Sequence, residues 1–197
     1  MKKWLVLSLV GLLLAVSSVV YAGEPLDAVQ TQVNGVLNVL RDQSLKGETG
    51  LKVKREKIRT ASQKLFDFVE LSKRTLGMNW NNLSVEQRKE FVRLYTDLLE
   101  DAYIDKITAY TDEKVRFTKE IRLSEKTVEV RSTVTTKTAD VPINYRVIKA
   151  DGSWKVYDVV IEGVSLISNY RTQFREILAN KPPASLLETL RAKVGKR

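Results

Sequence analysis

Residues 115–161 decide the fold: VRFTKEIRLSEKTVEVRSTVTTKTADVPINYRVIKADGSWKVYDVVI. Apolar side chains occupy alternate positions in four segments of this stretch, as in Val128, Val130 and Val134. A period of two residues is typical of β-strands with one buried face. The connections are short, and Asp151-Gly152 is typical of a two-residue hairpin turn. The stretch therefore predicts a four-stranded antiparallel meander with one covered face and one wet face.

The segments on both sides of this sheet have the three- to four-residue apolar spacing of amphipathic helices. Ser84 and Gln87 also predict a capping box at the start of the longest helix. The order helices, strands, helices predicts a single α+β domain, in which helices pack on one face of the sheet around an apolar cavity. The helices are expected at about 25–44, 51–69, 70–76, 84–110, 166–180 and 186–194.

The longest predicted helix, 84–110, has an apolar surface wider than one stripe, since Tyr95, Leu98 and Ile104 do not share a single narrow face. Such a helix is expected to be buried on two sides. It would cover the sheet, lie between the sheet and other helices, or border an internal cavity. Ordinary close packing is the alternative to a cavity, because apolar stripes usually form core.

The N-terminal segment has the pattern of a secretory signal peptide. Two lysines precede the apolar run 4–16, and the small residues Val20 and Ala22 precede the expected cleavage site. An uncleaved membrane anchor is the alternative, because the apolar run is fairly long. We expect residues 1–22 to be the signal peptide, residues 23–197 to be a folded α+β domain, and the exported protein to be in the periplasm.

The charge of the chain favours anionic partners. The formal net charge is +9, of which Lys2 and Lys3 contribute two, leaving +7 for residues 23–197. A basic exported protein is attracted to anionic membrane surfaces or acidic partners. Nucleic acid is not expected as a partner, because the basic residues are spread along the chain without an aromatic-rich basic motif.

The chain lacks the residues of most catalytic sites. It contains no His and no Cys, which excludes triads and zinc sites built on these residues. Asp97, Glu100, Asp101 and Asp105 cluster on the longest predicted helix, and a pair of them could act in acid–base catalysis. A solvated helix face with basic neighbours explains them better. We therefore expect a binding protein with no enzyme activity, no catalytic residue, no metal and no cofactor.

Two stretches carry a family resemblance. The first is LGMNW at 76–80, followed by the capped helix from Ser84. The second is WKVYDVVIEGVSL at 154–166, followed by Asn169-Tyr170-Arg171 and Phe174. Together they resemble the MlaC family of periplasmic phospholipid-transport proteins, also called toluene-tolerance proteins. The resemblance runs over nearly the whole chain after the signal peptide.

The resemblance implies a soluble carrier that shuttles phospholipid between outer- and inner-membrane complexes and so maintains outer-membrane lipid asymmetry. It implies two protein partners: an outer-membrane lipoprotein–porin complex and an inner-membrane ABC transporter complex with an MCE-domain subunit. The phospholipid tails would lie in an apolar cavity between sheet and helices, and the carrier would hydrolyse nothing. Residues 23–197 would then be a lipid-binding domain.

The residues expected to line this cavity are inward positions of the third and fourth strands and apolar positions of the helices. Part of this set is expected to touch lipid and the rest to be ordinary core. The set is Leu76, Trp80, Phe91, Tyr95, Leu98, Ile143, Tyr145, Val147, Val159, Ile161, Val164, Ile167 and Tyr170.

Polar residues of the second motif have expected roles as well. Arg171 is expected to form an ion pair with Asp158 or Glu162, and contact with the lipid phosphate is the alternative. Gly77 and Gly163 lie at the ends of predicted elements, where they are candidate hinges or, alternatively, helix caps and turns.

Three other functions stay open at this stage. They are a periplasmic chaperone or adaptor that binds apolar segments, a small α+β enzyme with an apolar substrate pocket, and a membrane-surface binder that uses the basic charge. The ligand separates them, because lipid, a converted small molecule, a peptide and an anionic bilayer are chemically distinct.

Overall fold

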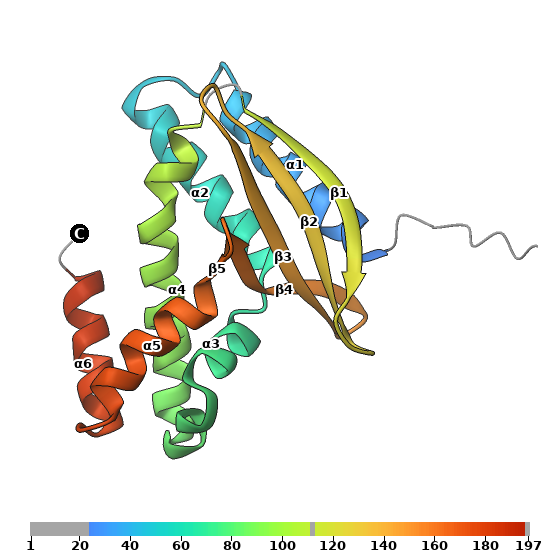
Figure 1. Cartoon of the computed structure of the whole chain (residues 1–197). Helices are drawn as coiled ribbons and strands as arrows, with labels where there is room; N and C mark the ends of the chain where they lie inside the picture. Colours follow the sequence, from blue (N-terminus) through green and yellow to red (C-terminus); the bar gives the residue numbers. More distant parts are fainter. Residues whose placement is uncertain (1–23, 111–112, 196–197) are drawn as a thin grey trace, which may run out of the picture.

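The structure is a computed structural model that describes residues 24–110 and 113–195, so the predicted signal peptide, residues 1–22, lies outside the described residues. Helices come first, a β-meander follows and two helices end the chain, which confirms the predicted α+β class (Figure 1). The elements are α1 (Glu24–Arg41), α2 (Gly47–Leu65), α3 (Phe68–Leu76), the 3₁₀ helix η1 (Gly77–Asn82), α4 (Val85–Thr108), β1 (Lys114–Arg122), β2 (Thr127–Thr135), β3 (Asp140–Ala150), β4 (Ser153–Ile161), β5 (Val164–Ser165), α5 (Leu166–Leu178) and α6 (Pro183–Val194).

The sheet is antiparallel throughout, in the order β1-β2-β3-β4-β5. Its first four strands confirm the predicted meander. The fifth, β5, was not predicted because a strand of two residues shows no alternation. Both short turns use left-handed backbone at two successive residues, with φ of 48° and 78° at Asp151-Gly152 and 49° and 84° at Glu162-Gly163. Two positive φ values in succession are the requirement of a type I′ hairpin turn.

One face of the sheet is covered by α1, which runs along the sheet in Figure 1. Val130, Val147 and Val156 on this face are fully buried, and Val29 of α1 packs against them. The sequence predicted that α4 covers this face of the sheet, and this prediction is wrong. The helix α4 instead faces the sheet across a space, and α1 fills the position expected for it.

The expectation that α4 is buried on two sides is confirmed. One side packs on α3, α5 and α6, where Phe91 and Tyr95 meet Phe174 at ring-centroid distances of 5.7 and 5.2 Å. Aromatic pairs of this kind contribute about 1 kcal/mol each beyond their buried area. The other side, with Leu99 and Ile104, faces the space next to the sheet. The capping box at Ser84 and Gln87 is present and starts the helix.

The predicted second helix, over about 51–69, is interrupted at Phe66. This residue forms a parallel bridge with Val156, and the Asp67 amide donates to the Val156 carbonyl oxygen at 2.9 Å. The Asp67 side chain then caps α3 by accepting from the Glu70 amide at 2.8 Å. The junction between α2 and α3 is thereby attached to β4. Among the described helices, none has both the length and the hydrophobicity that a bilayer crossing requires.

Candidate functional site

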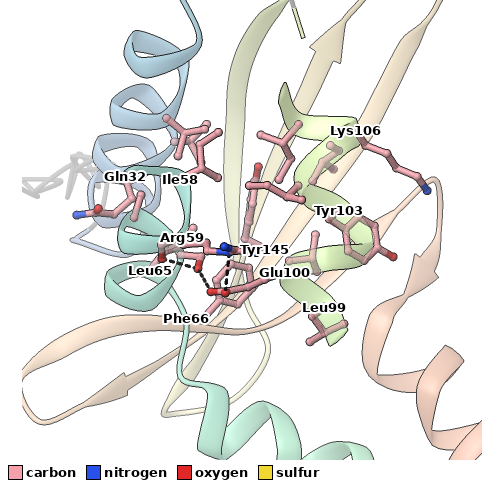
Figure 2. Close-up of a pocket in the computed structure, with 18 of the residues that line it drawn as sticks. Gln32, Ile58, Arg59, Leu65, Phe66, Leu99, Glu100, Tyr103, Lys106 and Tyr145 are labelled. Carbon is pink, nitrogen blue, oxygen red and sulfur yellow. Dashed lines mark hydrogen bonds and ion pairs between the residues drawn. The ribbon is translucent and has the colours of Figure 1, made fainter. Parts of the chain in front are cut away.

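A cavity of about 420 Å³ lies between the sheet, α1, α2 and α4 (Figure 2). Its walls are almost entirely apolar. The sheet contributes inward side chains from β1 to β4, and the helices contribute the faces they turn toward it. The principal apolar side chains are Val33, Val36, Leu37, Leu40, Ile58, Ala61, Leu65, Phe66, Phe68, Leu71, Leu99, Ile104, Ile107, Val115, Val134, Ile143, Val159, Ile161 and Leu166.

The hollow follows from the way its walls are fixed. Phe66 and Asp67 hold the end of α2 against β4, and α1 is packed on the sheet. Meanwhile α4 is held on its other side by α6, with Arg191 bound to both carboxylate oxygens of Glu90 at 2.7 and 2.9 Å. The walls are thus tied to different partners and do not collapse onto each other.

Where α2 faces α4, the cavity edge is polar, and two carboxylates share one guanidinium. Glu100 accepts from the Ser62 hydroxyl at 2.7 Å and lies 3.6 Å from the Arg59 guanidinium. Arg59 also pairs with Asp101 at 3.0 Å. Burial raises the pKa of Glu100, although the Ser62 hydrogen bond and the Arg59 charge act in the opposite direction. Among the described residues, both carboxylates thus contact Arg59 and together outnumber its single positive charge.

The tyrosine hydroxyl groups of the lining are uncharged. Burial raises the pKa of Tyr145 to about 12, so its hydroxyl stays protonated at physiological pH. On α4, burial also raises the pKa of Tyr103. The Lys106 ammonium lies 5.3 Å from the centre of the Tyr103 ring, in a cation–π contact.

This arrangement is suited to holding an apolar chain. The volume corresponds to roughly 14 groups of the size of a water molecule, which is also about the size of a methylene. Cavities lined in this way bind ligands mainly by removing apolar surface from water. Among residues 24–110 and 113–195, no group of three or more Asp or Glu side chains is placed to hold a metal ion.

The structure brings four of the thirteen predicted lining residues to this cavity: Ile143, Tyr145, Val159 and Ile161. All four come from the inward face of β3 and β4. Val147 lies on the same face, buried beneath α1. Val164 is 61% exposed at the start of β5. The remaining seven lie in or against the cluster between α4 and helices α3, α5 and α6: Leu76, Trp80, Phe91, Tyr95, Leu98, Ile167 and Tyr170.

The lining residues that the sequence did not assign to the site come mostly from α1, α2 and the C-terminal half of α4. The apolar residues among these helical positions belong mostly to helical stripes that were visible in the sequence. The spacing shows that such a stripe is buried, but not whether it faces a space or other side chains. Val33, Leu37, Ile58 and Ile104 are examples.

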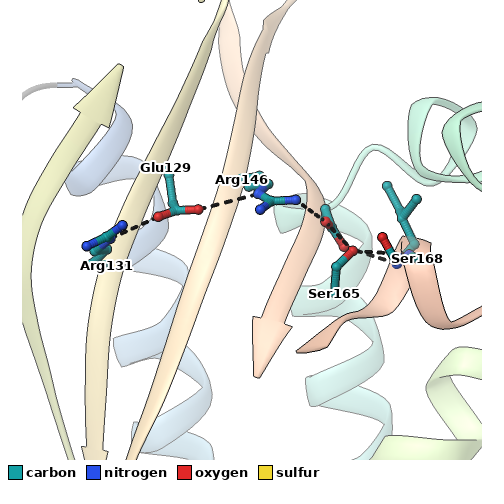
Figure 3. A network of polar contacts seen from close by, with 7 residues as sticks. Glu129, Arg131, Arg146, Ser165 and Ser168 are labelled. Carbon is teal, nitrogen blue, oxygen red and sulfur yellow. Dashed lines mark hydrogen bonds and ion pairs between the residues drawn. The ribbon is translucent and has the colours of Figure 1, made fainter. Parts of the chain in front are cut away.

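The motif residue Asp158 has a different partner from the one expected. Its carboxylate is buried on the other face of the sheet, where it accepts from Arg146 at 3.1 Å, from the Ser165 hydroxyl at 2.7 Å and from the Ile167 amide at 3.1 Å (Figure 3). The expected ion pair with Arg171 is therefore not formed. Arg171 instead donates to the Arg74 carbonyl oxygen at 2.6 Å, because the start of α5 occupies the carboxylate.

The Asp158 contacts end a row of charges that crosses three strands. Arg131 binds Glu129 at 2.9 Å, Glu129 binds Arg146 at 3.4 Å, and Arg146 binds Asp158 (Figure 3). Two carboxylates and two guanidinium groups make the row neutral. It connects β2, β3 and β4 to the N-terminus of α5. The first residue of α5, Leu166, lines the cavity, so these contacts hold this part of the cavity wall in place.

The two glycines singled out in the sequence lie at a cap and a turn. Gly77 ends α3 with φ of 57°, and Gly163 completes the turn between β4 and β5 with φ of 84°. Both backbone conformations favour glycine. The cap and turn interpretation is confirmed for these positions.

Comparison with known proteins gives a consistent family. The family model described as MlaC protein matches residues 30–192. The intermembrane phospholipid transport system binding protein MlaC of Haemophilus influenzae is 29% identical over 101 residues, 49% of this chain and 47% of that protein. The match thus spans about half the length of that relative. The solved structure of the phospholipid-binding protein from Ralstonia solanacearum in complex with a phospholipid is similar at a TM-score of 0.79, with 25% identity, over 88% of this chain and 98% of that chain.

Proposed function

The chain belongs to the MlaC family, and on this premise we propose that it is a periplasmic carrier that binds phospholipid by its tails. The observation that carries the proposal is the apolar cavity of about 420 Å³ between the sheet and helices α1, α2 and α4. It provides the space for a fatty tail that a close-packed core of this size would lack. The phospholipid bound by the Ralstonia solanacearum relative supports the same ligand class.

The tails dominate the binding energy in this proposal. A buried methylene contributes about 0.8 kcal/mol, so a tail that buries roughly ten of them contributes about 8 kcal/mol. A partly exposed ion pair with the headgroup adds at most about 1 kcal/mol. The carrier therefore accepts different headgroups and is sensitive to any change in the cavity volume.

The Haemophilus influenzae relative is named as the binding protein of an intermembrane phospholipid transport system, which supports a role of this chain in such a system. We propose that the chain receives and delivers phospholipid at an outer-membrane lipoprotein–porin complex and at an inner-membrane ABC transporter complex with an MCE-domain subunit, in support of outer-membrane lipid asymmetry. Export by residues 1–22 would place it in the periplasm between the two. Its part is to bind and release, with no chemical step and no cofactor beyond the lipid itself.

The proposal is tested by purifying the protein from cells, extracting it with organic solvent and identifying the extract by mass spectrometry. The expected result is phospholipid in near-stoichiometric amount. The delipidated protein should also take up phospholipid from vesicles and give it back to acceptor vesicles.

The rival functions predict other outcomes of the same experiment. A chaperone would yield peptide, and an enzyme would yield a converted small molecule. An extract without phospholipid, together with no uptake from vesicles, would exclude the carrier function.

A further inference from the structure

Two cations reach the cavity lining, Arg59 and Lys106, and they differ in how they are paired. Arg59 is bound to Asp101 at 3.0 Å and lies 3.6 Å from Glu100. In contrast, Lys106 is exposed and has no ion pair within the described part of the chain. Within residues 24–110 and 113–195, its ammonium has no carboxylate partner at the edge of the apolar cavity.

The position of Lys106 is fixed by its own helix. Its ammonium lies 5.3 Å from the ring centre of Tyr103, one turn earlier on α4, while part of the side chain lines the cavity. Figure 2 shows Lys106 and Tyr103 directed away from Arg59 and Glu100. Among the described residues, the cavity therefore has one edge where Arg59 is paired with carboxylates and a second edge where Lys106 forms no ion pair.

For a phospholipid held by its tails, the two edges that carry a cation are the candidate positions of the phosphate. The anionic phosphodiester does not enter the apolar interior, because removing it from water without a counter-charge is costly. At the first edge it would compete with two carboxylates for Arg59 and meet their negative charge. At the second it meets an ammonium without competition.

We propose that Lys106, positioned by the ring of Tyr103, binds the phosphate of the phospholipid whose tails occupy the cavity. This inference rests on the proposed carrier function and adds its phosphate site. Arg171, the cation suggested by the sequence, is not in the lining and is held by the Arg74 carbonyl oxygen.

The test compares two lipids with identical tails, phosphatidylglycerol and diacylglycerol, which lacks the phosphate. Delipidated protein is loaded from vesicles containing equal amounts of both, and the bound ratio is measured by mass spectrometry. Lys106→Gln should lower the preference for phosphatidylglycerol about three- to fivefold, the factor expected from one partly exposed ion pair. Lys106→Arg should retain the preference.

The matched control is Lys89→Gln, because Lys89 is an exposed lysine of the same helix outside the cavity lining. This variant should load both lipids in the native ratio. An unchanged ratio in Lys106→Gln, with total loading intact, would overturn the phosphate site while leaving the carrier function standing. Failure of the native protein to load either lipid would instead reject the carrier function.

A last experiment tests whether Lys106 binds the phosphate of the lipid or any free phosphate ion. Loading in inorganic phosphate should give the same ratio as loading in chloride at equal ionic strength, because the tails hold the lipid phosphate next to Lys106. A ratio that collapses only in inorganic phosphate would assign Lys106 to a general anion site and contradict the proposal.

Discussion

Asp158 connects the sheet to α5 through a single buried carboxylate, only 1% exposed. One oxygen accepts from Arg146 and the Ser165 hydroxyl, and the other accepts from the Ile167 amide in the first turn of the helix. A carboxylate at a helix N-terminus is stabilised by the free amides and by the helix dipole. The residue therefore acts as a counter-ion and as a helix cap at the same time.

Replacing this carboxylate should be costly. We predict that Asp158→Ala lowers the free energy of unfolding by about 3 kcal/mol, because Arg146 loses one of its two counter-ions and the first turn of α5 loses one of its two side-chain acceptors. The measurement is urea unfolding at neutral pH. The control is Asp97→Ala, which removes an exposed ion pair with Arg93 and should cost less than about 1 kcal/mol. Equal losses in the two variants would contradict the role assigned to Asp158.

At the residue scale, the sequence identified Asp158 but not its partner. The motif around it was visible, and an Arg–Asp pair was a sound expectation for a buried carboxylate. Which arginine supplies the pair depends on the register of β3 and β4, where Arg146 lies opposite Asp158. Strand alternation fixes the face of a residue but not its neighbour on the next strand.

The turn between β4 and β5 is the element that brings the chain from the sheet into α5. It consists of Glu162 and Gly163, both with positive φ. We predict that Gly163→Ala lowers the free energy of unfolding by about 1 kcal/mol, since a Cβ disfavours a φ of 84° even though the space around it is open. The measurement is again chemical unfolding.

The matched control is Gly35→Ala in the middle of α1. This glycine also has open space around it, but its backbone is helical. The substitution should therefore raise the stability, by up to about 1 kcal/mol. Opposite signs at the two positions are expected, and a gain at Gly163 would show that the turn does not require a glycine.

Elements with a local signal were predictable and elements defined by tertiary contact were not. Four strands followed from alternation, and the start of α4 followed from Ser84 and Gln87. The break at Phe66 and the strand β5 depend on pairing with β4, a contact distant in sequence. The Asp67 cap was not predicted either, because the apolar period runs through Phe66 without a break.

The site was predictable in its strands and not in its helices. The strand positions in the lining were predicted because alternate side chains of a strand all point to the same face of the sheet. These positions are Ile143, Tyr145, Val159 and Ile161. The helix α4 has two buried sides, and its spacing gives no indication of which one is hollow. The sequence favoured the side with Phe91 and Tyr95, which the structure fills with α5 and α6.

At the scale of the whole molecule, the cavity lowers the free energy of unfolding relative to a close-packed core. Cavity-forming substitutions lose about 24 cal/mol for each Å³ left unfilled, so an apolar cavity of about 420 Å³ without a ligand lowers the stability of the fold. A ligand tail removes this cost by supplying the missing contacts. Occupancy of the cavity should thus be coupled to the stability of the fold.

The central claim is that this cavity holds the lipid tail, and it is tested most directly by filling the cavity with a side chain. Ala61 of α2 lines it, whereas Ala102 of α4 is similarly half-buried outside the lining. Ala61→Trp should displace at least two methylenes, and a loss of about 1.6 kcal/mol corresponds to more than tenfold weaker binding.

The measurement is the phospholipid bound per protein at limiting lipid, after loading from vesicles, with folding of each variant verified by circular dichroism. The account predicts a loss of more than tenfold in affinity for Ala61→Trp and native loading for Ala102→Trp. Native loading by a folded Ala61→Trp protein would contradict it, because the tail would then be bound somewhere else.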